Sequence, residues 1–211
     1  MTKEKIKNFI DFRFVPLKKR TYITRILLFW LFNIPFYFFD KFSVTAGIVF
    51  SVINVFSSVL FIRLVITKAA TKEAKFLSEG IAYTYYSAVC LIAGFIALSF
   101  PNGYNFLLLF ILILIYLLCA ALYFLLVLKN IRKDIYNEKK AGAGGKSFIA
   151  PFTGGLLGIS AGRLFSSVFS SQELSFYIIS ACLLFMSYIL SICYISFIRL
   201  YFLKNLSKCQ N

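Results

Sequence analysis

Six long apolar segments alternate with short polar stretches along the chain. A transmembrane helix needs about 20 mostly apolar residues, and each segment reaches this length, the first one only just. The segments lack the alternation of apolar and polar residues that a lipid-facing barrel strand requires, so helix is the expected state. The pattern predicts an all-α integral membrane bundle with six transmembrane helices, at about 22–39, 42–67, 80–100, 106–128, 147–170 and 174–198.

The spacing of these segments predicts three helical hairpins within a transmembrane domain at 21–203. The breaks inside the hairpins are very short, at 40–41, 101–105 and 171–173. The breaks between hairpins are longer, and we expect residues 68–76 and 129–140 to extend the second and fourth helices past the membrane. The glycine-rich stretch 141–145 would end the second extension and act as a flexible joint. Residues 204–211 would form a short cytoplasmic tail.

The basic residues predict the orientation of the bundle. Twenty of the 23 Lys and Arg residues lie in alternate breaks or at the helix ends beside them, and the exceptions are Lys41, Arg63 and Arg163. Segments flanked by Lys and Arg stay on the cytoplasmic side of a membrane, so both termini are predicted to be cytoplasmic. The richness in Phe, Ile, Lys and Asn is in the style of an AT-rich bacterial genome. We therefore expect the cytoplasmic membrane of a bacterium.

Residues 1–20 have the pattern of a basic amphipathic segment. Apolar side chains recur at helical spacing from Ile6 to Leu17, with basic residues between them. Such a helix lies in the headgroup plane, and Pro16 is expected to end or bend it. The triplet Lys18, Lys19 and Arg20 is a candidate site for anionic headgroups on the cytoplasmic face.

Composition supports the membrane interpretation. Apolar residues make up 60% of the 211 residues and charged residues 15%, whereas a soluble domain averages about 45–50% and about 25%. A net charge of +15 in a soluble protein would suggest nucleic acid. Here the charge lies beside apolar segments, and no stretch interleaves basic and aromatic residues on an exposed face, so anionic lipid is the expected partner and nucleic acid is not.

The residue types that carry most enzyme chemistry are missing from the apolar segments. The sequence contains no histidine, and no Asp or Glu lies in the central part of a segment. This excludes Cys–His and Ser–His nucleophiles and a carboxylate pair within the membrane. The five cysteines form no C-x-x-C motif and read as small hydrophobes. We therefore predict a protein that is not an enzyme and that needs neither a metal nor another cofactor.

The fifth segment carries a stripe of small residues, one at every fourth position: Ala150, Gly154, Gly158, Gly162, Ser166 and Ser170. Faces of this kind let two membrane helices approach closely. The plainer interpretation is packing inside the protein, against a matching face of the sixth segment at Ser180, Ser187 and Ser191. The alternative is a homo-oligomer interface, or a groove that receives the helix of a membrane-protein partner.

Arg163 lies on the order of 10 Å inside the outer interface, where an unpaired charge is costly. Ser160 and Ser167 share its helix face, and Asn33 of the first segment should lie at a similar depth. These four residues predict a small polar pocket that opens outward. The competing interpretation is an arginine whose side chain reaches back to the headgroups.

Three functions are consistent with these features. The first is a non-enzymatic protein that packs its helices against a partner in the membrane, such as an immunity or accessory protein for a toxin or a secretion system. The second is a channel or transporter for ions or small solutes, with its pocket around Arg163. A lipid enzyme or a signalling sensor ranks last, because no acid–base pair is visible.

Overall fold

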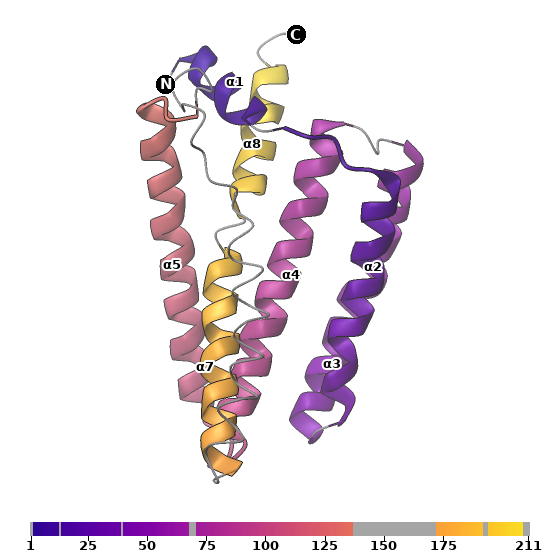
Figure 1. Cartoon of the computed structure of the whole chain (residues 1–211), viewed down its shortest axis with the longest axis vertical. Helices are drawn as coiled ribbons and strands as arrows, with labels where there is room; N and C mark the ends of the chain where they lie inside the picture. Colours follow the sequence, from indigo (N-terminus) through magenta and orange to yellow (C-terminus); the bar gives the residue numbers. More distant parts are fainter. Residues whose placement is uncertain are drawn as a thin grey trace.

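The computed structural model of the chain describes residues 2–12, 14–38, 40–67, 71–136, 172–191 and 194–208. All regular secondary structure in these ranges is helical (Figure 1). The helices, in chain order, are α1 (Lys3–Asp11), α2 (Lys19–Asn33), the 3-10 helix η1 (Ile34–Phe38), α3 (Lys41–Thr67), α4 (Lys72–Ser99), α5 (Phe106–Arg132), α7 (Gln172–Ser191) and α8 (Ile195–Lys208).

Five segments of the described chain are long and apolar enough to span a membrane. They are Lys19–Phe38, Lys41–Thr67, Lys72–Ser99, Phe106–Arg132 and Ser175–Leu206. These segments correspond to five of the six predicted helices, and the fold is that of a multi-pass membrane protein. The remaining predicted helix, at 147–170, lies outside the described residues.

Part of the polar stretch that follows α3 forms the first turn of α4. α4 begins at Lys72, and its N-cap residue Thr71 accepts a hydrogen bond from the backbone N–H of Ala74 at 3.2 Å. The prediction that residues 68–76 extend the second helix is therefore wrong, because α3 ends at Thr67. A Thr N-cap followed by an acidic first turn is a local start signal that outweighs the continuing helical pattern.

The extension of α5 is shorter than predicted. The helix begins after Asn105, whose side chain accepts the N–H groups of Leu107 and Leu108, and it ends at Arg132. Asp134, two residues further on, has a φ of 57°, in the left-handed region that a right-handed helix cannot include. The helix therefore stops well before residue 140.

α4 is the central helix of the described bundle, and it packs most extensively against α7 (Figure 1). Ser87 Oγ lies 2.8 Å from the carbonyl oxygen of Ser187, and Ser187 Oγ donates to the carbonyl of Ser87 at 2.9 Å. Ser180 donates to the carbonyl of Gly94 at 2.7 Å. The small face of the last predicted helix thus meets α4, whereas we had expected it to meet the fifth segment.

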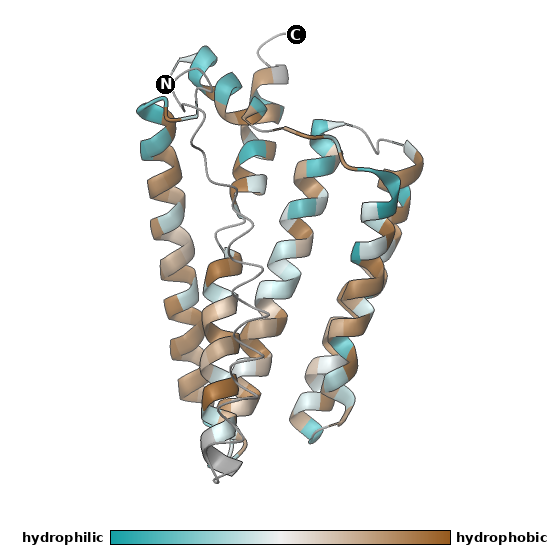
Figure 2. Ribbon diagram, viewed as in Figure 1, coloured by the Kyte–Doolittle hydropathy of each residue, from teal (hydrophilic) through white to brown (hydrophobic). Residues whose placement is uncertain are grey.

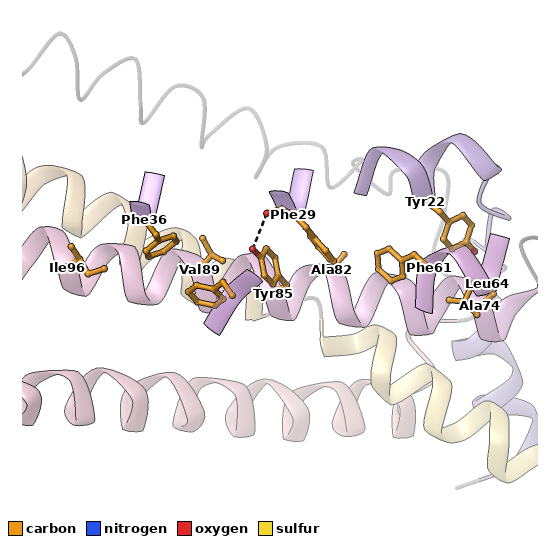
Figure 3. Packing of buried hydrophobic residues seen from close by; sticks show 11 residues of the cluster. Tyr22, Phe29, Phe36, Phe61, Leu64, Ala74, Ala82, Tyr85, Val89 and Ile96 are labelled. Atoms are coloured by element: carbon orange, nitrogen blue, oxygen red, sulfur yellow. Dashed lines mark hydrogen bonds between the residues drawn. The ribbon is translucent and has the colours of Figure 1, made fainter. Parts of the chain in front are cut away.

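α2 and η1 pack against α3 to form a second unit, which joins α4 through an aromatic core. Figure 3 shows this core, with Phe29 and Tyr85 facing each other from α2 and α4. Their ring centroids are 4.3 Å apart, and the Tyr85 hydroxyl donates to the carbonyl oxygen of Phe29 at 3.1 Å. Phe61 of α3 contacts the same Phe29 ring, so three helices meet there.

The two ends of the bundle differ in polarity. α1, the beginnings of α2 and α4, and the ends of α3, α5 and α8 lie together at one end, which we call the basic end (Figure 1). Figure 2 shows hydrophilic residues concentrated there and apolar residues along the helices between the ends. The described residues at the basic end include most of the Lys and Arg of the described chain. The short turns at 100–105 and around Asp40 lie at the opposite end.

Candidate functional site

Most residues of the predicted polar pocket and of the small-residue stripe lie outside the described residues. They are Arg163, Ser160 and Ser167 of the pocket, and Ala150, Gly154, Gly158, Gly162, Ser166 and Ser170 of the stripe. Their predicted roles stay predictions.

Asn33, the fourth predicted pocket residue, takes part in helix packing. It is 1% exposed, and its side-chain nitrogen donates to the carbonyl of Gly47 at 3.1 Å and to Ser51 Oγ at 2.6 Å. In the other direction, the side-chain nitrogen of Asn54 in α3 donates a hydrogen bond to the carbonyl of Phe29 in α2, at 3.2 Å. The two amides thus join α2 to α3.

The predicted headgroup residues lie at the surface of the basic end. Lys18, Lys19 and Arg20 are all exposed at the start of α2, and Lys18 is its N-cap residue. This exposure leaves the three side chains accessible to headgroups.

α1 docks on the basic end of the protein itself. Phe9 and Ile10 are buried, Phe9 against Val127, Ile131 and Ile198 of the long helices. Polar contacts fix the same helix, because Lys5 Nζ donates to the backbone oxygen of Arg132 and Asp11 pairs with Lys72. The apolar face expected to enter the lipid is thus covered by α4, α5 and α8.

Beneath α1 lies a group of six charged and hydroxyl side chains that we call the Glu79 cluster. It joins three helices and consists of Arg25 of α2, Lys75, Ser78 and Glu79 of α4, and Ser196 and Arg199 of α8. The side chains of Arg25, Lys75 and Glu79 are 12%, 10% and 18% exposed. These three side chains are therefore mostly buried, and a small part of each remains accessible to water.

Glu79 is the shared counter-ion of this cluster. Its Oε1 lies 3.9 Å from Nη2 of Arg25 and 3.9 Å from Nζ of Lys75, and its Oε2 accepts a hydrogen bond from Ser196 at 3.3 Å. Arg25 also donates through Nη1 to Ser78 Oγ, at 2.7 Å. The carboxylate thus holds α2, α4 and α8 together at one level of the bundle.

Arg199 completes the cluster with a different set of contacts. Its guanidinium lies over the rings of Phe9 and Phe76, at 5.2 and 5.6 Å from their centroids, so α1 covers it from above. Its Nε is buried without a hydrogen-bond partner among the described residues. The positive charges of Arg199 and Arg25 both act on Lys75.

Sequence reasoning had missed this cluster. None of its six residues was among the site residues predicted from the sequence. The signal available in the sequence was Lys75–Glu79 at a spacing of four, the geometry of an ion pair on one helix face. Arg25 and Arg199 belong to distant segments, so only the packing of the helices brings them to it.

The opposite end has its own polar contact, between the two short turns. The hydroxyl of Tyr104 donates to Asp40 Oδ2, and Asp40 Oδ1 accepts the backbone N–H of Ser43 at 2.9 Å. Burial, together with the hydrogen bond to Asp40 and its negative charge, raises the pKa of Tyr104 above its usual range. The hydroxyl therefore stays protonated and remains a donor throughout the physiological pH range.

An apolar cavity of about 310 Å³ lies between η1 and the α4–α7 pair. Its lining is almost entirely hydrophobic and includes Phe36, Val89, Cys90, Ile96, Phe176 and Leu183. Within the described residues, no group of three or more His, Cys, Asp or Glu could hold a metal ion.

Comparison of the chain with known protein families, with curated proteins and with solved structures gives no match.

Proposed function

We propose that the chain is a non-enzymatic membrane protein that acts by packing its helices against those of a partner within the bilayer. An immunity or accessory protein for a toxin or a secretion system would work in this way. The proposal rests on α5, which buries only Leu112, Tyr116, Val127 and Ile131 against the rest of the described protein.

The remaining faces of α5 are apolar and open. Leu107, Phe110, Leu118 and Leu125 are each 59–66% exposed, and α5 has few contacts with its neighbours. Such a helix is covered by lipid in the free protein, and a partner helix replaces lipid there with close packing. A helix with this composition offers no polar lining for a conduit, which favours binding over transport.

We further propose that the basic end faces the cytoplasm of a bacterial cell, so that both termini are cytoplasmic. The exposed Lys18, Lys19 and Arg20 support this orientation, because basic residues are retained on the cytoplasmic side and attract anionic headgroups there. Membrane lipids would thus be a second class of partner.

The decisive experiment combines a flux assay with site-specific cross-linking. A photo-reactive residue at Leu118, with buried Val127 as the control position, is expected to cross-link one defined membrane protein in cells of the native host. Purified protein in liposomes is expected to move neither ions nor small solutes. Cross-links to lipid alone would contradict the binding proposal, and flux above that of protein-free liposomes would favour the alternative, a channel or transporter.

A further inference from the structure

The Glu79 cluster contains more positive charge than its own carboxylate can neutralise. Arg25, Lys75 and Arg199 are cationic, and Glu79 is the one acidic side chain among the six members. The formal charge of the cluster is therefore +2. Buried charge is costly unless it is paired, so an uncompensated cluster of this kind favours the entry of an anion.

Hydrogen-bond donors in the cluster are also in excess. A guanidinium has five N–H donors, yet Arg25 makes one short bond, to Ser78, and its contact with Glu79 is 3.9 Å long. The guanidinium of Arg199 lies over two rings, and its Nε is buried without an acceptor among the described residues. Lys75 uses one donor on the carbonyl of Val15, at 2.8 Å. Unfilled donors thus converge from α2, α4 and α8.

We propose that the Glu79 cluster is a binding site for a phosphate group. Phosphate carries a charge of about −1 to −2 and several acceptor oxygens, which match two guanidinium groups and an ammonium group contributed by three neighbouring helices. Glu79 lies about 10 Å along α4 from its first residue, at the basic end where headgroup phosphates of a bilayer are found. A phospholipid headgroup and a free phosphate compound share this chemistry.

Glu79 has a specific role in this proposal. Its carboxylate neutralises one of the three positive charges and keeps the cations together, and Ser196 donates a hydrogen bond to one of its oxygens. Phosphate competes with the negatively charged Glu79 carboxylate for the same three cations. Replacing Glu79 with Gln therefore strengthens phosphate binding.

The test uses the full-length protein in a neutral detergent, titrated with inorganic phosphate or with short-chain phosphatidylglycerol. Binding is read from the thermal unfolding temperature and by native mass spectrometry. Both readouts are expected to show saturable binding to the wild-type protein. Arg199→Gln should weaken it about tenfold, and Glu79→Gln should strengthen it. Arg63→Gln removes an exposed arginine of α3 and serves as the matched control, with unchanged binding.

The outcomes separate the two sources of phosphate. Saturable binding of inorganic phosphate assigns a soluble phosphate ligand, and binding of phosphatidylglycerol but not of phosphatidylcholine or inorganic phosphate assigns an anionic headgroup. Arg199→Lys, which keeps the charge, is the second variant if Arg199→Gln does not fold. Absence of saturable binding to the wild-type protein, or equal losses in Arg199→Gln and Arg63→Gln, would overturn the proposal.

Discussion

At the scale of single residues, Asn33 shows how a polar side chain is accommodated between apolar helices. Its amide nitrogen reaches both a backbone carbonyl and a hydroxyl of α3, where the close approach of Gly47 leaves that carbonyl accessible. A hydrogen bond between membrane helices contributes about 0.6–1.7 kcal/mol, so one residue is significant for the pairing of α2 with α3.

Asn33→Ala is expected to lower the free energy of unfolding by about 1 kcal/mol, and Ser51→Ala by less. The double variant should lose less than the sum of the single variants, because both remove the same 2.6 Å bond. Denaturant titration in detergent micelles measures all four proteins. Strictly additive losses would show that the two side chains do not interact.

Tyr104 illustrates a second kind of polar contact, at the edge of the membrane. Tyr104→Phe is expected to cost about 1.5 kcal/mol, because the hydrogen bond to a carboxylate is lost. Because the pKa of Tyr104 is raised in the folded protein, the stabilisation of the fold by its hydrogen bond is fully present below the unfolded-state pKa of about 10. It is lost only as the pH rises through the higher folded pKa.

The stability difference between the wild-type protein and Tyr104→Phe should therefore be constant between about pH 6 and about pH 9. Thermal unfolding across this range measures it. Tyr201→Phe, at an exposed tyrosine of α8, is the control and should leave stability unchanged at every pH. A difference that disappears already at pH 8 would mean that the folded pKa of Tyr104 lies below the ordinary value of about 10 instead of above it.

At the scale of helices, the pairing of α4 with α7 depends on small residues at the contact. A Cβ atom added to Gly94 would lie 2.9 Å from Cγ of Leu184, closer than real side-chain contacts allow. The glycine thus permits the approach that brings Ser180 to the Gly94 carbonyl.

Gly94→Ala is expected to destabilise the protein by about 1–3 kcal/mol through overpacking. Adding Leu184→Ala should recover part of the loss, because it removes the side chain that the new methyl group meets. Thermal unfolding of the single and double variants measures both effects. Destabilisation without recovery would place the cause elsewhere than in this contact.

α1 is the helix whose docking is most easily tested. Phe9→Ala removes a fully buried ring that contacts α5, α8 and Tyr136, and should release α1 from the bundle at a cost of about 3 kcal/mol. Trypsin should then cleave after Lys3, Lys5 or Lys7 at least about tenfold faster than in the wild-type protein. Val15→Ala, at an exposed position, should leave the cleavage rate unchanged.

The sequence could predict the helices themselves because a long apolar run has one stable state in lipid. It could not predict that α7 pairs with α4, because Ser180 and Ser187 fit any small-residue face, and only the fold shows that they bond to backbone carbonyls of α4. The Glu79 cluster could not be predicted from the sequence either, because Arg25 and Arg199 become neighbours of Glu79 only through the fold.

At the scale of the whole molecule, the proposed orientation predicts a pattern of chemical labelling. The native cysteines are replaced, and a single cysteine is introduced at Lys133 of the basic end or at Asn102 of the opposite end, both exposed. In intact cells, a membrane-impermeant maleimide should label Asn102→Cys and should label Lys133→Cys only after permeabilisation. The reverse result would invert the orientation and place the Glu79 cluster on the outside.

The hydrogen bonds between Ser87 and Ser187 join residues that are 100 positions apart in the chain. At a synthesis rate of about 5–20 residues per second, α4 waits about 5–20 seconds in the membrane before its main neighbour has been made. During that interval Ser87 can already bond the hydroxyl of Tyr116 in α5, at 2.7 Å, but the surface of α4 that later meets α7 otherwise has lipid or an insertion factor to contact. Biogenesis of this protein is therefore expected to depend on a chaperone that covers α4, and a chain that ends after α5 should be recognised by membrane quality-control proteases.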